Sequence, residues 1–131
     1  MSGAMDTNVA ATTSINSIRF NNAAARTITI ASGQQLTVSS GGILETADVG
    51  ANDNLITGGT ISAGTTNSTG LSVIQNNPDG TLTIDSIVGG GGLTKSGPGT
   101  LVLGGGAANT FNGSAVVNAG TVELNKSAGV A

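Results

Sequence analysis

The sequence predicts an all-β protein, a right-handed parallel β-helix (β-solenoid) of about five or six coils that is a fragment of a longer solenoid. Three observations predict it: apolar residues alternate in short pairs, glycine-rich breaks separate the pairs, and large side chains are scarce. The 131 residues contain 22 glycines, 18 threonines, 13 serines and 13 asparagines, but only two aromatic residues. Ile, Leu, Val and Phe number 31 and the net charge is −3, which favours a thin packed core over disorder.

Six pairs of apolar residues are each separated by one residue, which is the period of two that a β-strand shows. Thr, Val and Ile, which favour strands, fill these segments. No segment of ten residues has the apolar spacing of an amphipathic helix. In chain order the pairs are Ile28/Ile30, Leu36/Val38, Leu71/Val73, Leu82/Ile84, Leu101/Leu103 and Val122/Leu124.

Breaks rich in Gly, Ser, Asn and Pro follow most pairs and predict tight corners. Strands with only two inward side chains are too poor to cover a sandwich face, whereas stacked coils of a solenoid suit them. Strand starts recur roughly every 7–12 residues, so three strands give a coil of roughly 20–25 residues, right-handed by the usual crossover preference. Asparagine is expected to adopt left-handed corners and to form amide ladders, with solvated loops as the alternative. The breaks are residues 32–33, 39–42, 58–59, 76–80, 89–92, 97–99 and 104–106.

The chain divides into a start and one structural segment. Residues 1–8 are expected to be a disordered start that includes a cloning remnant, because they lack the charged and apolar regions of a signal peptide. Residues 9–131 are expected to be a single solenoid segment. The sequence stops directly after a strand with no polar cap, which predicts a longer parent protein and an open end that stacks head to tail.

Composition excludes several classes of function. The chain has no His and no Cys, which removes Ser-His-Asp and Cys-His nucleophiles, the usual zinc sites, disulfides, haem and iron–sulfur clusters. Four basic residues and a pI near 4.3 argue against nucleic acid. No apolar run approaches the roughly 18 residues of a membrane span. No cofactor and no small-molecule substrate are predicted.

Residues 91–124 have the most specific pattern. They begin Gly-Gly-Leu-Thr-Lys-Ser-Gly-Pro-Gly-Thr-Leu-Val-Leu, continue through Asn-Thr-Phe-Asn-Gly, and close with Gly-Thr-Val-Glu-Leu. This resembles the autotransporter-associated β-strand repeat, also called the passenger-associated transport repeat. Phe111 stands where that family usually has Tyr, and Val122 where it has Leu. The motif positions are Gly91, Gly92, Leu93, Thr94, Lys95, Gly97, Gly99, Thr100, Leu101, Leu103, Asn109, Thr110, Phe111, Gly113, Val117, Gly120, Thr121 and Leu124.

The resemblance implies a right-handed β-helix in the passenger of a bacterial type V secretion protein, at the cell surface or outside the cell. It implies a non-enzymatic segment that projects a distal region and assists folding and transport, with the parent chain's own outer-membrane β-barrel as partner. Because coils have mainly local contacts, residues 91–124 are expected to act as a folding nucleus. The alternative is an adhesin or self-association module that binds through the solenoid wall or stacks end to end into fibres.

Two groups of residues are candidates for chemistry. Residues 89–96 nearly spell a phosphate-binding loop, but Thr94 stands where glycine is needed and no helix is predicted to follow, which favours a corner with a surface lysine. The acidic residues are interpreted as solvated charges, because the basic residues that a lyase would need are scattered, at Arg19, Arg26, Lys95 and Lys126. A divalent ion bound near Glu45, Asp48 and Asp53 is the alternative. The other two acids of this group are Asp79 and Asp85.

Threonine and phenylalanine carry the last two hypotheses. Thr-x-Thr at Thr27/Thr29 and Thr81/Thr83 is the kind of pair that orders water on ice-binding solenoids, but the pairs are not regularly spaced, so outward strand threonines are predicted. Phe20 and Phe111 are predicted to lie in the core, with ligand contact as the alternative.

Overall fold

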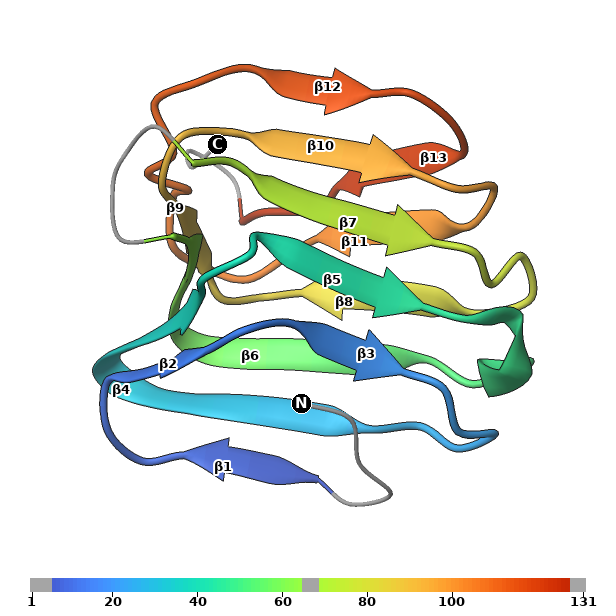
Figure 1. Cartoon of the computed structure of the whole chain (residues 1–131), viewed down its shortest axis with the longest axis horizontal. Coiled ribbons are helices and arrows are strands. Elements are labelled where there is room, and N and C mark those ends of the chain that lie inside the picture. Colours follow the sequence, from blue (N-terminus) through green and yellow to red (C-terminus); the bar gives the residue numbers. More distant parts are fainter. Residues whose placement is uncertain (1–5, 65–68, 128–131) are drawn as a thin grey trace.

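The computed structural model describes residues 6–64 and 69–127, and these residues wind into a β-solenoid of about five turns (Figure 1). This confirms the predicted all-β solenoid. A single 3-10 turn, η1 (Ala47–Val49), interrupts the strands, and no helix in the described ranges is long and apolar enough to cross a membrane. The strands are β1 (Thr7–Val9), β2 (Thr13–Ile15), β3 (Ile18–Phe20), β4 (Thr27–Val38), β5 (Gly42–Glu45), β6 (Asn54–Ala63), β7 (Leu71–Gln75), β8 (Thr81–Ile84), β9 (Ile87–Gly89), β10 (Leu93–Ser96), β11 (Thr100–Leu103), β12 (Ala115–Val117) and β13 (Thr121–Leu124).

Two parallel sheets form the walls. One has the order β1-β4-β6-β8-β11-β13, with β2 paired to β4 and β9 paired to β6, and the other has the order β12-β10-β7-β5-β3. Strands therefore stack from β1 at one end to β12 and β13 at the other (Figure 1). Leu82 is in register with Leu101, 19 residues on, whereas Ile43 is in register with Val73, 30 residues on. The coils thus vary more in length than the sequence predicted, because corners of different length absorb the difference.

The core lies between the walls and is filled by the alternating apolar residues. Five of the six predicted pairs are buried, and the sixth lies at the last strand, where Val122 is partly buried and Leu124 is 80% exposed. Phe20 is buried, and Phe111 packs partly buried against the core, as predicted. The solenoid interior is therefore well covered everywhere except at its C-terminal end.

The tight corners are made by glycine. Within the described ranges every residue with positive φ is a glycine, so the prediction that asparagine adopts left-handed corners is wrong. Glycine wins these positions because it lacks the Cβ that makes this conformation costly. The asparagines act through their side chains instead. Asn54 Oδ1 accepts a hydrogen bond from the Arg26 amide at 2.8 Å, which links one coil to the next.

The longest strand contains an irregularity that shapes one wall. In β4, Ile30 pairs with Gly58 of β6, but the next registered pair is Gln35 with Thr60, so four residues of β4 lie opposite Gly59 alone. Gly58 has φ of 75°. A Cβ there would overlap the carbonyl oxygen of Ile30, so only glycine lets the two strands approach at this bulge.

Candidate functional site: the C-terminal repeat coil

The C-terminal motif contains its own coil-to-coil interface. β12 pairs with β10 and β13 pairs with β11, so that Leu93 is in register with Ala115 and Leu101 with Val122. The second half of the motif therefore stacks directly on its first half, at separations of 22 and 21 residues. A segment that begins at β10 and ends at β13 carries both partners of the interface and depends on no distant part of the chain for it.

Close approaches between coils explain several of the motif's glycines. A Cβ on Gly113 would overlap the carbonyl oxygen of Gly91, and a Cβ on Gly92 would lie 2.8 Å from that of Ser114. Gly120 has φ of 73°, and a Cβ there would lie against the carbonyl oxygens of Gly97 and Gly99. At these positions the repeat needs glycine because the backbone of the neighbouring coil occupies the space of a side chain.

Lys95 points into the solenoid, which corrects the prediction of a surface lysine. Its side chain is fully buried, in register with Val73 below and Val117 above. Lys95 shares a strand face with Leu93, two residues earlier, so the alternation that placed Leu93 inside also places the lysine there. The alternation of strand residues was therefore the signal that could have placed Lys95 inside. The prediction followed the general rule that charged side chains are exposed.

Three backbone carbonyl oxygens satisfy the buried ammonium group. Lys95 Nζ donates to Ser96 O at 3.1 Å, to Gly97 O at 2.7 Å and to Ala119 O at 3.0 Å. Ser96 is the last residue of β10 and Gly97 begins the turn after it, whereas Ala119 belongs to the turn after β12. Burial lowers the pKa of Lys95 below its ordinary value. Lys95 therefore joins two successive coils from inside, and the absence of a side chain at Gly120 leaves room for its Nζ.

A second buried polar group lies lower at the same corner of the solenoid. Glu45 is fully buried, so the prediction that it is a solvated charge is wrong. Its Oε2 accepts from Asn54 Nδ2 at 3.0 Å, and its Oε1 accepts from Gln75 Nε2 at 3.1 Å and from Asn77 Nδ2 at 3.0 Å. Three amide donors around one carboxylate satisfy it without a cation, and they tie β5 to the coil above.

The other acids do not join Glu45. Asp48 and Asp53 are exposed, and Asp53 Oδ1 accepts from the amide and hydroxyl of Thr81 at 2.8 and 3.0 Å. Asp79 is also exposed, and Asp85 is partly buried. Across the described ranges no three acids, histidines or cysteines gather as metal ligands would.

The middle of the motif anchors its linker. Asn109 Oδ1 accepts from the Val88 amide at 3.0 Å, while the amides of Thr110 and Phe111 donate to the Val88 carbonyl oxygen at 2.9 and 3.1 Å. These bonds hold the segment before β12 against β9 of the preceding coil. The residues before β10 form a turn that runs into a strand, so the near match to a phosphate-binding loop has no helix after it.

Among the described residues, no strand covers the last coil of the solenoid. A cavity of about 330 Å³ lies among the inward side chains of the last coil. Leu124 is 80% exposed and Val117 is 52% exposed, although both occupy strand positions that are buried in earlier coils. The main apolar lining residues are Leu93, Leu103, Phe111, Val117, Val122 and Leu124.

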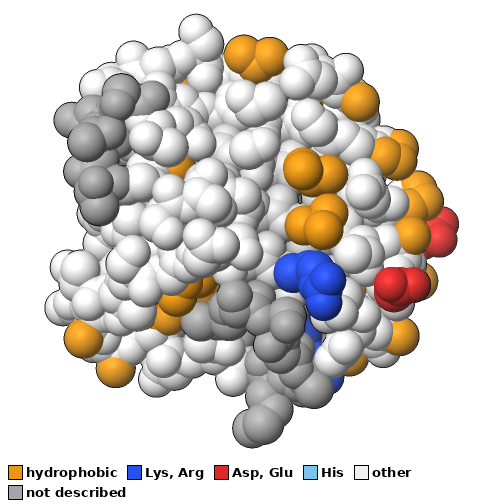
Figure 2. Space-filling model, in the orientation of Figure 1, with side chains coloured by type: hydrophobic (Ala, Val, Ile, Leu, Met, Phe, Trp, Pro, Cys, Tyr) orange, Lys and Arg blue, Asp and Glu red, His pale blue; other side chains and the backbone are white. Residues whose placement is uncertain are grey.

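One face of the outer wall is mostly polar. Figure 2 shows one face made mostly of polar side chains and backbone, with hydrophobic side chains in small separate groups. The two Thr-x-Thr segments are offset by two residues, because the column of Thr27 continues through Leu55 to Thr83 and not to Thr81. Thr81 stacks with Thr100 and Thr121, but the column of Thr83 continues with Val102 and Glu123, so paired threonines do not repeat from coil to coil on these strands.

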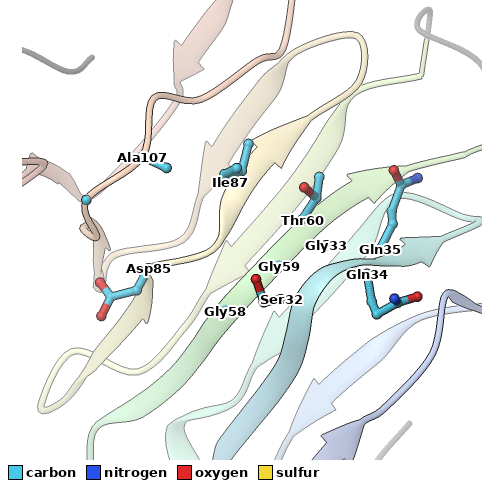
Figure 3. Close-up of a pocket in the computed structure, with 11 residues that line it drawn as sticks. Ser32, Gly33, Gln34, Gln35, Gly58, Gly59, Thr60, Asp85, Ile87 and Ala107 are labelled. Carbon is cyan, nitrogen blue, oxygen red and sulfur yellow. The ribbon is translucent and has the colours of Figure 1, made fainter.

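The bulge in β4 borders a groove of about 360 Å³. Figure 3 shows Gly58 and Gly59 along its middle, with Asp85 on one side and Gln34 and Gln35 on the other. Both glutamines are held within the protein: Gln34 Oε1 accepts from the Thr12 amide at 2.9 Å, and Gln35 Nε2 donates to Ser62 Oγ at 2.8 Å. The groove thus exists because the glycines at the bulge have no side chains to fill it, and its two glutamines are already hydrogen-bonded within the protein.

Comparison with protein families decides the identity of the C-terminal coil. Residues 93–124 match the family model of the passenger-associated-transport-repeat. This segment carries that repeat. The repeat associates the chain with the passenger of a bacterial autotransporter, a class of secreted or cell-surface protein. No curated protein and no solved structure matches the chain.

Proposed function

We propose that residues 9–131 act as one non-enzymatic solenoid segment of a secreted passenger, and that the passenger-associated transport repeat assists its folding and its transport across the outer membrane. The segment would project a more distal region from the cell surface. The observation that carries this proposal is the self-contained interface of the repeat, in which β12 stacks on β10 and β13 on β11.

A self-contained interface suits a chain that emerges unfolded from a pore. Loop closure over about 20 residues costs little entropy, so coils with local partners form early. Once folded, such a unit is too wide to slide back through the pore. The hydrogen bonds of Lys95 would also stabilise the folded repeat, because the ammonium gains its third acceptor only when the turn at Ala119 has docked. The partner in this process would be the outer-membrane β-barrel of the parent chain.

Surface display tests the proposal. The chain, with an epitope at its N-terminus, is fused upstream of an autotransporter barrel, and surface epitope is measured by flow cytometry together with barrel insertion. One variant lacks residues 93–124. The control lacks residues 71–92, a whole coil whose removal brings Leu93 to the register position of Leu71 and Leu101 to that of Leu82. It also carries Glu45→Leu, because the deletion removes Gln75 and Asn77, two of the three donors to the buried carboxylate.

The proposal expects loss of surface epitope, with the barrel still inserted, when residues 93–124 are missing, and near-normal display when residues 71–92 are missing. Equal display of both variants would show that the repeat has no special part in transport. Equal loss of display in both would show that any shortened solenoid fails, and it would also contradict a specific role of the repeat.

A further inference from the structure

Four buried polar side chains form a network inside one corner of the solenoid. They belong to Glu45, Asn54, Gln75 and Asn77. We propose that this polar network selects the register in which β7 pairs with β5, its neighbour in the wall (Figure 1). The selection places one coil on another, and it does not depend on the proposed role in transport.

Every polar side-chain atom of the network has a partner. Both carboxylate oxygens of Glu45 accept hydrogen bonds from the three amide groups. The amide oxygens are used too: that of Gln75 accepts from the Asn77 amide at 2.9 Å, and that of Asn77 accepts from the Asp79 amide at 3.2 Å. The oxygen of Asn54 is bonded to the coil below. A buried network in which every member is satisfied favours one arrangement over those that leave members unpaired.

The apolar pattern of β7 allows more than one register. In the structure Ile43 lies opposite Val73, and Glu45 lies opposite Gln75. Strand side chains alternate with a period of two, so a slip of one residue would turn the apolar side chains outward, whereas a slip of two would keep them inside. In one such slip Leu71 would lie opposite Ile43. Corners, which already differ in length from coil to coil, would take up the two residues.

The polar network distinguishes these registers. That slip moves Gln75 and Asn77 along the strand by about 6.6 Å, which takes both amides out of hydrogen-bond reach of the carboxylate. Val73 would then lie opposite Glu45, and Asn54 would be the one donor left to the buried charge. The slip in the opposite direction would also take the Gln75 amide away from the carboxylate. Leaving a buried charge or amide unpaired is costlier than exchanging one apolar contact for another, so the network favours the observed register.

Disulfide trapping reads this register directly, because the chain has no cysteine of its own. Leu44 and Ile74 lie opposite each other at outward positions of β5 and β7. Cysteines at both positions would have Cα atoms about 4.8 Å apart, a spacing that suits a disulfide. Leu44→Cys combined with Ser72→Cys or with Asn76→Cys reports a slip of two residues in either direction. In the observed register the Cα atoms of these pairs are about 8 Å apart, too far for a disulfide.

The rate of crosslinking under mild oxidation is measured for each pair in three backgrounds. The first is the parent chain, and the second lacks the network through Glu45→Leu, Asn54→Leu and Gln75→Leu. Asn77 is kept, because its amide also donates to a backbone carbonyl oxygen of the coil below. The third background, Val73→Ala, is the matched control, because it creates a cavity in the same strand and leaves the network in place.

In the parent chain and in Val73→Ala, the pair at 44 and 74 is expected to crosslink at least tenfold faster than either slipped pair. Without the network this preference is expected to fall below about threefold, because the apolar pattern then fits both registers. A preference that stays tenfold without the network would show that the corners alone set the register. Loss of the preference in Val73→Ala as well would show that any loss of stability permits the slip. Either result would overturn the inference.

A second variant keeps the test decisive if circular dichroism shows that the chain without the network does not fold. Val73→Gln with Gln75→Val moves the amide donor two residues earlier in β7 and leaves Glu45 in place. The slipped register then restores a donor opposite the carboxylate, so the pair at 44 and 72 is expected to crosslink fastest. Faster crosslinking of the pair at 44 and 74 in this variant would contradict the inference.

Discussion

Replacing Lys95 with methionine separates its hydrogen bonds from its bulk. Methionine has a similar length and is apolar, and it would occupy a register column whose neighbours are Val73 and Val117. The substitution removes three bonds from Nζ to backbone oxygens, and it leaves those oxygens without this donor. It also removes the cost of burying a charge.

The two effects oppose each other, and the structure indicates which is larger. Hydrogen bonds from a charged donor contribute about 1.5–3 kcal/mol each, and all three bonds of Lys95 are between 2.7 and 3.1 Å. Desolvation of the ammonium offsets several kcal/mol of that sum. We therefore expect Lys95→Met to lower the free energy of unfolding by about 2–3 kcal/mol, equivalent to a fall in Tm of about 8–12 °C.

Urea unfolding measures the global effect, and hydrogen exchange locates it. Because coils of a solenoid open separately, the amides of β12 and β13 should exchange faster in Lys95→Met, while those of β4 and β6 change little. Lys126→Met is the matched control: its Nζ is buried and donates no hydrogen bond to any described residue, and only the charge of Asp85 favours its ammonium form, so its loss should cost less than that of Lys95.

The opposite result would refute this reasoning. Buried charges replaced by apolar residues of similar size sometimes stabilise a protein. If Lys95→Met is as stable as the parent chain and β12 exchanges no faster, then the lysine does not join the coils and its bonds only offset its own burial.

Three further predictions follow from the same contacts. Burial lowers the pKa of Lys95 from its ordinary value of 10.5, so the lysine binds its proton more tightly in the unfolded chain than in the folded one. In a Lys126→Met background, the free energy of unfolding should therefore rise with pH up to about 10.5. Urea titrations from pH 7 should show a flatter slope when Lys95→Met is added, since the chain has no His, Cys or Tyr to titrate in this range. Gly113→Ala should lower the free energy of unfolding by about 1–3 kcal/mol, because the added methyl group overpacks against Gly91. Gly106→Ala is the control and should leave thermal melts nearly unchanged, because its Cβ would meet only Ser127 Oγ, at 3.8 Å. Equal destabilisation by both substitutions would contradict the close approach at Gly113. Glu45→Gln should cost about 2–3 kcal/mol, because an amide turns a donor toward the three amides that now bond the carboxylate; unchanged urea unfolding would contradict it.

Much of the fold could be predicted from the sequence because its signal is local. Pairs such as Leu36/Val38 and Leu82/Ile84 have the period of a strand, and glycines between them mark corners, so strands and coils follow from spacing alone. The register of one coil on another could not be predicted, because it depends on corner lengths. The 30-residue step from Ile43 to Val73 and the bulge opposite Gly59 are settled only when the walls pack.

The candidate site was predicted in part. The motif located the repeat, and the family match covers nearly the same residues. The inward positions of Lys95 and Glu45 were missed, because both were judged by charge and not by strand alternation. Alternation from Leu93 and Ile43 would have placed both inside. Their partners, carbonyls and amides on neighbouring coils, are not visible in a sequence because they are brought together only by the register.

The direction of the strands has a mechanical consequence. The strands lie across the axis along which they stack (Figure 1). Tension along that axis therefore breaks the hydrogen bonds between two neighbouring strands one after another. Coils would then detach singly and not shear together. Each detached coil of about 20 residues would release roughly 70 Å of chain. A protein of this kind unfolds under load in steps, one coil at a time. The bonds of Lys95 and Glu45 to neighbouring coils would resist the detachment of those coils.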